Sequence, residues 1–322
     1  MRSRGVARPR PLASLLLLAA VIVLLPFVFT ANFHLRVIVL VWIYSLAAIG
    51  LNLMMGYGGQ VSLGHGAFLA IGAYAVAVGS SRWGLSPAVT LPGGVLVSAA
   101  LAFVVGRPIL RLKGHYLAVG TLGFGVLVFM ALTNQVAWSG GPDGMQVVRR
   151  ALFGWDMRGN IFWYALTGSL LMIGAWIALN LANSPTGLAL RALRDSEIAS
   201  SSLGVDIARQ KLFVFVLSAC YASVAGSLIA LFNGHVTPGL SDFMVSVQLV
   251  TMVVLGGMGS VLGSVVGAAL LVLLPQVLSS LHDYEQAFIG FVMVASAIFL
   301  RAGIVPSLAR ALQSRNRHDI TS

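Results

Sequence analysis

Charged residues make up only 9% of the 322-residue chain, whereas hydrophobic residues make up 58%. Soluble globular proteins carry roughly 25% charged residues, because their surfaces must be hydrated. With 20 basic and 9 acidic side chains and a mean hydropathy of +0.93, this chain is too apolar to present such a surface to water. These values exclude a soluble enzyme and a disordered polar protein, and they predict a protein embedded in a lipid bilayer.

Cysteine and lysine are also scarce. The single cysteine, Cys220, cannot form an internal disulfide, which excludes a secreted disulfide scaffold. The two lysines, Lys113 and Lys211, lack the glycine-rich turn and following Ser or Thr of a phosphate-binding loop, so any ATP chemistry must take place on a partner. The net charge of +11 comes from residues clustered between apolar runs, which is typical of membrane topology and not of nucleic-acid binding. We expect no metal site and no cofactor.

Apolar runs without Asp, Glu, Lys or Arg recur along the chain, and about 20 helical residues suffice to cross a bilayer core of roughly 30 Å. They predict an all-α, polytopic transmembrane helical bundle of about ten spans. The first run is long for a signal peptide and no clear cleavage site follows it, which favours an uncleaved span. The short run 244–257, followed by glycines, is either half of a broken helix or continuous with its neighbour. The ten runs are 12–31, 37–55, 60–79, 88–106, 116–133, 160–181, 212–232, 244–257, 261–279 and 286–300.

The basic residues between the runs predict the orientation. If the N-terminus is cytoplasmic, most of the 20 lysines and arginines fall on the inner side, as the positive-inside rule requires, and both termini are cytoplasmic. We therefore expect a basic cytoplasmic N-terminus (1–11), a transmembrane domain (12–300) with a large cytoplasmic loop (182–211), and a basic cytoplasmic tail (301–322). The five exceptions on the outer side are Arg36, Arg82, Arg149, Arg150 and Arg158.

The outer gap 134–159 divides the chain into halves of about five spans each. An odd number of spans per half would orient the halves oppositely in the membrane, as in inverted-repeat transporters. Each half also contains a glycine-rich apolar stretch, at 56–64 and 255–263. This pattern predicts an inverted repeat. In the second stretch, Gly259, Gly263 and Gly267 have the four-residue spacing of close helix packing.

The cytoplasmic loop 182–211 predicts one helix over about 185–203. Ser184 is a good N-cap and Pro185 suits the first helical turn. Arg191 and Asp195 are i,i+4 neighbours that can pair on one face, and Gly204 offers a left-handed stop.

Polar residues are concentrated in the glycine-dense stretch 52–65. Unwound backbone within a membrane must be buried in protein or line a cavity, so this stretch is either a broken helix beside a pathway or a small-residue packing face. A Ser–His nucleophile pair for a membrane hydrolase is disfavoured, because no strained turn and no orienting group accompany it. The lack of acidic or basic residues in the spans also disfavours proton coupling. The polar residues are Asn52, Gln60, Ser62 and His65.

Several segments together resemble one known family. The stretch 51–68, followed by Gly72-Ala73-Tyr74, is similar to the permease subunits of branched-chain amino-acid ATP-binding-cassette (ABC) importers, and most closely to the M-type subunit of the Liv system. The resemblance covers about residues 37–300. Further matching segments are 114–118 with Thr121-Leu122, Asn134 with 139–144, 184–187 through 191–195, and 254–260.

The resemblance implies partners and a location. Two permease subunits would form the pathway in a bacterial inner membrane. The resemblance favours a related H-type chain as the second subunit and leaves a second copy of this chain open. Two P-loop ATPases would dock beneath them, and a periplasmic binding protein would deliver the small-molecule substrate. The transmembrane region would then be a permease domain, and its loop helix would contact the ATPases. The resemblance leaves urea or short amides open as substrates, and a secondary carrier or channel without ATPases remains the main rival.

The resemblance also implies roles for particular residues. None is expected to be catalytic. The candidates for coupling to the ATPases are Arg191, Arg194, Asp195, Glu197 and Gly204, and the candidates for the translocation path are Asn52, Gln60, Ser62, His65, Tyr116 and Thr121.

Overall fold

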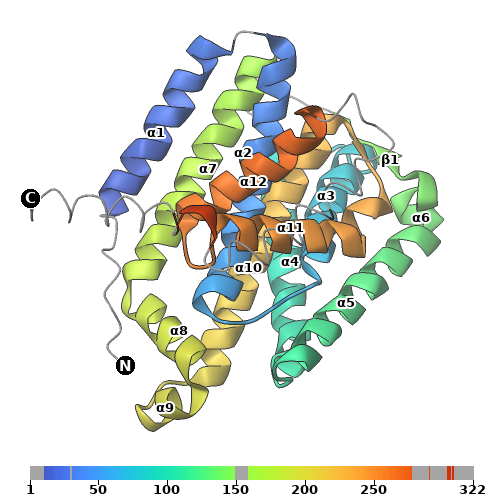
Figure 1. The fold of residues 1–322 in the computed structure, drawn as a ribbon. Coiled ribbons are helices and arrows are strands. Elements are labelled where there is room, and N and C mark those ends of the chain that lie inside the picture. The colour runs from blue at the N-terminus through green and yellow to red at the C-terminus, as the bar shows by residue number, and fades with distance from the viewer. Residues whose placement is uncertain are drawn as a thin grey trace, which may run out of the picture.

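The charge-free runs of the sequence become helices almost one for one (Figure 1). The computed structural model describes residues 11–29, 31–148 and 159–277, together with 290, 303–305 and 307. The predicted run 286–300, the first ten residues and nearly all of the tail 301–322 therefore lie outside the described residues. The nine described runs form α1 (Pro11–Val28), α2 (Asn32–Asn52), α3 (His65–Ser81), α4 (Pro87–Ile109), α5 (His115–Asn134), α7 (Asn160–Asn183), α10 (Ile207–Asn233), α11 (Phe243–Gly256) and α12 (Val261–Val277).

Five of these segments are long and apolar enough to cross a membrane: α2 with its extension to Tyr57, α4, α5, α7 and α10. The helices α1, α3, α11 and α12 are apolar but shorter. Strand structure in the described part is limited to two residues each in β1 (Met145–Gln146) and β2 (His235–Val236). The chain is thus a helical, multi-pass membrane protein.

Helices α2, α3 and α10 form the centre of the bundle. Helix α10 packs along α3, α4 and α2, while α2 also packs against α7 and α12. Most of α2 and α10 is buried, because helices surround them on several sides. Glycine permits the closest approach: Gly226 of α10 lies directly against the backbone of Leu69 in α3. Close backbone approach replaces the hydrophobic driving force that lipid does not provide between membrane helices.

Helices α4 and α5 lie at the edge of the bundle, and few of their residues are buried. Leu96 and Val104 of α4, and Leu127 of α5, are more than 60% exposed. An apolar surface of this kind is stable only against lipid or another apolar subunit.

The segments that connect the long helices lie at two opposite ends of the bundle. At the ribbon end, β1 pairs antiparallel with β2, and the hydroxyl of Ser81 donates a hydrogen bond to the carbonyl of Gln146 at 2.7 Å. The segments 58–61, 112–115 and 193–197 meet around one cavity at the opposite end, which we call the coupling end after the coupling candidates predicted there. This division matches the alternation expected when successive spans cross in opposite directions.

The predicted single helix over 185–203 is wrong, because the chain breaks at Ser196. Helix α8 (Pro185–Asp195) and helix α9 (Glu197–Ser202) are separated by Ser196, whose backbone is extended with φ −161° and ψ 116°. The Ser196 hydroxyl accepts a hydrogen bond from the amide of Ala199 and so caps α9. The predicted N-cap is confirmed, since Ser184 accepts from the amide of Gly187. The predicted left-handed Gly204 is confirmed as well, with φ +80°.

Helices α11 and α12 are separate and pack against each other, which excludes one continuous helix. The glycine packing face is confirmed at two of its three positions. Gly263 and Gly267 of α12 lie against the backbone of Gly256 in α11. Gly259 instead lies in the intervening turn with φ +81°, a conformation that favours glycine.

Two glycines in membrane helices make a matched test of this packing. A Cβ on Gly226 would clash with the Leu69 backbone, whereas a Cβ on Gly93 of α4 would meet open space. We expect Gly226→Ala to destabilise the protein by about 1–3 kcal/mol, because backbone cannot move aside as a side chain can. Gly93→Ala should be neutral or slightly stabilising. Thermal unfolding in detergent measures both, and equal midpoints for the two variants would contradict the α3–α10 contact.

Candidate functional site

Helix α2 loses its regular winding immediately after Asn52. Residues Leu53–Tyr57 form a π-helix, η1, and residues 58–64 are non-helical until α3 begins at His65. Gly59 has φ +65°, and the amides of Gly58, Gly59 and Gln60 donate to carbonyls of η1 and its flanks. The structure therefore shows features of both alternatives from the sequence: the helix is broken, and Gly56 and Gly64 pack against the backbone of neighbouring segments. We call residues 53–64 the unwound segment.

Asn52 ties the two glycine-rich stretches together. Its Nδ2 donates to the carbonyl of Ser260 at 2.8 Å and to the hydroxyl of Ser264 at 2.7 Å. Its Oδ1 accepts from the amide of Gly259 at 2.8 Å. The side chain is buried and its hydrogen-bonding groups are engaged, so it holds α2 against the α11–α12 turn.

Ser62 and His65 lie together in the core. The His65 ring is 3.0 Å from the Ser62 hydroxyl through Nδ1, and 2.5 Å from the Ser218 hydroxyl through Nε2. Ser62, His65 and Ser218 are all fully buried. A nucleophile–base pair placed here would have no access to water, so the geometry suits attachment of α3 to α10 better than hydrolysis.

The two path candidates on α5 lie in different environments. Thr121 is buried; its hydroxyl accepts a hydrogen bond from the amide of Leu63 at 3.0 Å and donates to the carbonyl of Ala118. Tyr116 is 76% exposed in the first turn of α5. The structure thus brings Thr121 to the unwound segment and leaves Tyr116 at the surface.

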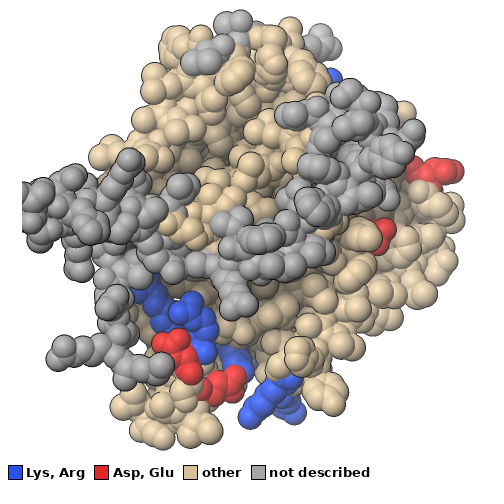
Figure 2. Space-filling view, in the orientation of Figure 1, with Lys and Arg blue, Asp and Glu red and all other residues tan. Residues whose placement is uncertain are grey.

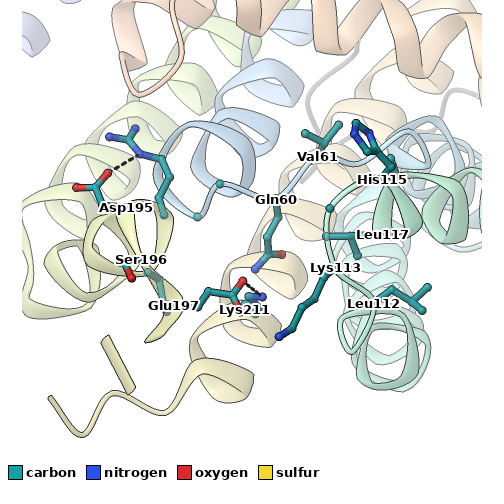
Figure 3. Close-up of a pocket in the computed structure, with 16 residues that line it drawn as sticks. Gln60, Val61, Leu112, Lys113, His115, Leu117, Asp195, Ser196, Glu197 and Lys211 are labelled. Carbon is teal, nitrogen blue, oxygen red and sulfur yellow. Dashed lines mark hydrogen bonds and ion pairs between the residues drawn. The ribbon is translucent and has the colours of Figure 1, made fainter. Parts of the chain in front are cut away.

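Gln60 points into a cavity of about 370 Å³ at the coupling end (Figure 3). It is only 3% exposed, yet neither its Oε1 nor its Nε2 has a hydrogen-bond partner in the described structure. The cavity walls are formed by the unwound segment, the start of α5, the α8–α9 junction and Lys211 of α10. We call this space the Gln60 cavity.

Charged side chains gather at the same end. Figure 2 shows that the described charges on this face concentrate over α8 and α9 and beside them, while most of the rest is uncharged. Within the cavity wall, the Lys211 ammonium is 2.5 Å from a Glu197 carboxylate oxygen. Arg194 is 3.6 Å from Asp195. The cavity therefore has both signs of charge on its wall.

Two arginines of α8 reach back to the membrane helices. The Arg194 Nη1 donates to the carbonyl of Gly56 in η1 at 2.5 Å. Arg191 donates to the carbonyl of Ala182 at 2.7 Å, and its guanidinium lies 5.2 Å from the centre of the Tyr57 ring. The expected Arg191–Asp195 pair is wrong, because Asp195 pairs with Arg194 and Arg191 turns toward α7.

Sequence reasoning missed the apolar tip of the α8–α9 region. Ile198 and Leu203 are 82% and 81% exposed, and Gly204 follows them with open space around its Cα. Figure 1 shows α9 projecting from the bundle beside α8. The sequence signal was available, since both are large apolar residues within the most polar loop of the chain.

A second missed feature is the segment before α11. The short helix η3 (Pro238–Ser241) packs against α3 and α5, and the Ser241 hydroxyl donates to the carbonyl of Gly125 near the middle of α5. The exposed Asp242 caps α11 by accepting from the amide of Met244. A carboxylate therefore lies beside the middle of a spanning helix.

Comparison with known proteins gives a consistent result. Residues 33–297 match the family described as branched-chain amino acid transport system / permease component. The chain is 37% identical to the high-affinity branched-chain amino acid transport system permease protein LivM of Salmonella typhimurium, over 82% of this chain and 68% of the relative. It is 36% identical to LivM of Escherichia coli, over 86% of this chain and 71% of that protein.

The identity to the permease protein LivH of Escherichia coli is lower, at 25% over 81% of this chain and 91% of that protein. No solved structure matches the chain significantly. The family match extends from the start of α2 beyond the end of α12 and includes the unwound segment, the α8–α9 region and the cavity between them. The chain therefore belongs to the family of permease components of branched-chain amino acid transport systems.

Proposed function

We propose that the chain is one permease subunit of an ABC importer for branched-chain amino acids in a bacterial inner membrane. It would work with a second, H-type permease, two P-loop ATPases and a periplasmic binding protein. The termini and the coupling end would face the cytoplasm, as the distribution of Lys and Arg favours. The observation that carries this proposal is the α8–α9 region, which connects an exposed apolar tip to the unwound segment through Arg194.

The outer surface of this region suits docking to another protein. Ile198 and Leu203 are large apolar residues exposed at an end of the bundle that also carries many charges. Exposed apolar anchors surrounded by polar groups are typical of protein interfaces. We infer that an ATPase groove receives this tip.

The inner surface of the region contacts the translocating domain. A charge-assisted hydrogen bond joins Arg194 to the Gly56 carbonyl, and the Arg191 guanidinium lies beside Tyr57 in the same turn of η1. A displacement of α8 by the ATPases would therefore act directly on the unwound segment. Rigid-body motion of the subunits could then alternate access between the two sides of the membrane.

Two alternatives differ from this proposal in their requirements. A secondary carrier or channel would transport without ATPases and would need no exposed apolar tip. A permease for urea or short amides would share the same partners but need no site for an aliphatic side chain. The matched relatives are named as transport permeases, and we assign no catalytic residue to this chain.

Isolation from the native membrane tests the assembly. We expect a tagged chain, purified in mild detergent, to bring with it a second permease and two P-loop ATPase chains identified by mass spectrometry. Ile198→Ser together with Leu203→Ser should reduce ATPase recovery at least about tenfold, because apolar anchors commonly contribute 2 kcal/mol or more to an interface. Ile173→Ser, which replaces an exposed residue of α7, is the matched control. Recovery of the wild-type chain alone would support a carrier or channel.

Arg194 provides a test of coupling. We expect Arg194→Met to lower leucine uptake per ATP hydrolysed at least about tenfold in proteoliposomes, because the bond to the Gly56 carbonyl is lost. Arg194→Lys should restore part of the uptake, since an ammonium can still donate to that carbonyl.

The control for this coupling test is Arg209→Met, which removes an exposed arginine in the first turn of α10. Uptake and ATPase activity that fall in proportion in Arg194→Met would assign the residue to assembly and would contradict a coupling role.

A further inference from the structure

We propose that the Gln60 cavity binds the transported amino acid as a zwitterion, between the unwound segment and the α8–α9 region. This inference rests on the proposed function and adds a substrate site to it. The cavity volume of about 370 Å³ lies within the range of small-molecule sites, at its lower end. Three independent features of its wall indicate the chemistry of the ligand.

The first feature is the amide of Gln60. A buried polar group without a hydrogen-bond partner is costly, and natural proteins rarely retain one without a reason. Both polar atoms of this side chain lack a partner in the described structure, although its neighbours Ser62 and Thr121 are fully engaged. An amide carries one acceptor and two donors, so it can bind an ammonium and a carboxylate at once.

The second feature is the pairing of opposite charges on the wall. The first turn of the 20-residue helix α5 has no side-chain cap, so its backbone amides face this end with the positive pole of the helix. Lys113, just before α5, extends toward the Glu197–Lys211 pair in Figure 3. The α5 amides and Lys113 suit a carboxylate. Glu197 uses Oε1 to pair with Lys211, and its other carboxylate oxygen suits an ammonium. A ligand of one charge would satisfy only one of these groups.

The third feature is an aliphatic part of the wall. Leu112, Leu117 and Leu193 come from three different elements and line the same cavity. An aliphatic side chain would gain from burial against them, whereas urea and short amides have no group to place there. The three features together favour a branched aliphatic amino acid among the substrates that remain open.

The position of the cavity also connects binding with coupling. Its wall includes Arg194, which holds the Gly56 carbonyl, and Glu197, the first residue of α9. A ligand here would contact both the unwound segment and the helices that we propose face the ATPases. We therefore place the site on the cytoplasmic side of the pathway, where the amino acid rests before release.

Equilibrium binding to the whole importer tests this site. The complex of permeases and ATPases is purified from its membrane and placed in lipid nanodiscs without the binding protein. Radiolabelled L-leucine is the probe. We expect saturable binding that unlabelled leucine displaces, and that 4-methylpentanoate, 3-methylbutylamine and urea displace at least about tenfold less well. The first lacks the ammonium, the second lacks the carboxylate, and urea lacks the aliphatic chain.

Variants of the cavity wall complete the test. Gln60→Met and Lys113→Met should each weaken leucine binding at least about tenfold, which is the typical effect of losing one hydrogen bond to a charged group. Gln135→Met at the far end of α5 and Arg111→Met outside the cavity wall are matched controls and should bind as wild type. Gln60→Met should unfold at no lower temperature than wild type, because it removes unpaired polar atoms without shortening the side chain.

The outcomes separate the site from the proposed function. Leucine binding that is unchanged in Gln60→Met, urea that competes as well as leucine, or no binding to the wild-type complex would overturn the cavity site. ATP-driven leucine uptake by the wild-type complex with its binding protein is measured in parallel. If that uptake is present, only the cavity inference fails; if it is absent, the proposed function fails as well.

Discussion

The structure depends on one constraint: lipid offers no hydrogen-bond partner to an unwound backbone. The chain leaves regular α-helical geometry between Asn52 and His65, first as a π-helix and then as non-helical backbone. The groups freed there are satisfied from elsewhere in the fold. Thr121 accepts from Leu63, and Arg194 donates to Gly56. The positions of α5, α8 and the α11–α12 turn follow from the need to enclose this segment.

The same constraint explains why polar and charged side chains gather at the coupling end, beside the unwound segment. An arginine that donates to a carbonyl of the unwound segment must come from an element outside the apolar core, and the α8–α9 region is such an element. Its partners and the cavity beside Gln60 then form one polar layer. Gln60 is the exception within this layer, because its amide is enclosed without being paired.

Much of the fold could be predicted from the sequence, because charge-free runs have few alternatives in a bilayer. Nine of the described helices agree with nine predicted runs, and Ser184 caps α8 as its residue type suggests. The break at Ser196 could not be predicted, since serine is acceptable both within a helix and as an N-cap.

The partners of the arginines were also beyond sequence reasoning. The acceptor of Arg194 is a backbone carbonyl 138 residues away, whereas spacing along a helix suggests only nearby partners. Among the site residues, the sequence indicated Asn52, Gln60, Ser62 and His65, because they are polar residues in an apolar stretch. It could not distinguish the paired side chains from the unpaired Gln60, because pairing is decided by distant segments. The inverted repeat stays a prediction.

The small β1–β2 ribbon has a mechanical consequence. It joins residues 145–146, in the gap between the two halves of the chain, to residues 235–236 of the second half. These backbone hydrogen bonds lie at the end of the bundle opposite to α8 and α9. A force applied at α9 would therefore act far from the ribbon, which holds the two segments together at the other end. Rotations about the ribbon would move α9 the most, the surroundings of Gly56 and Gln60 less, and the residues of β1 and β2 the least.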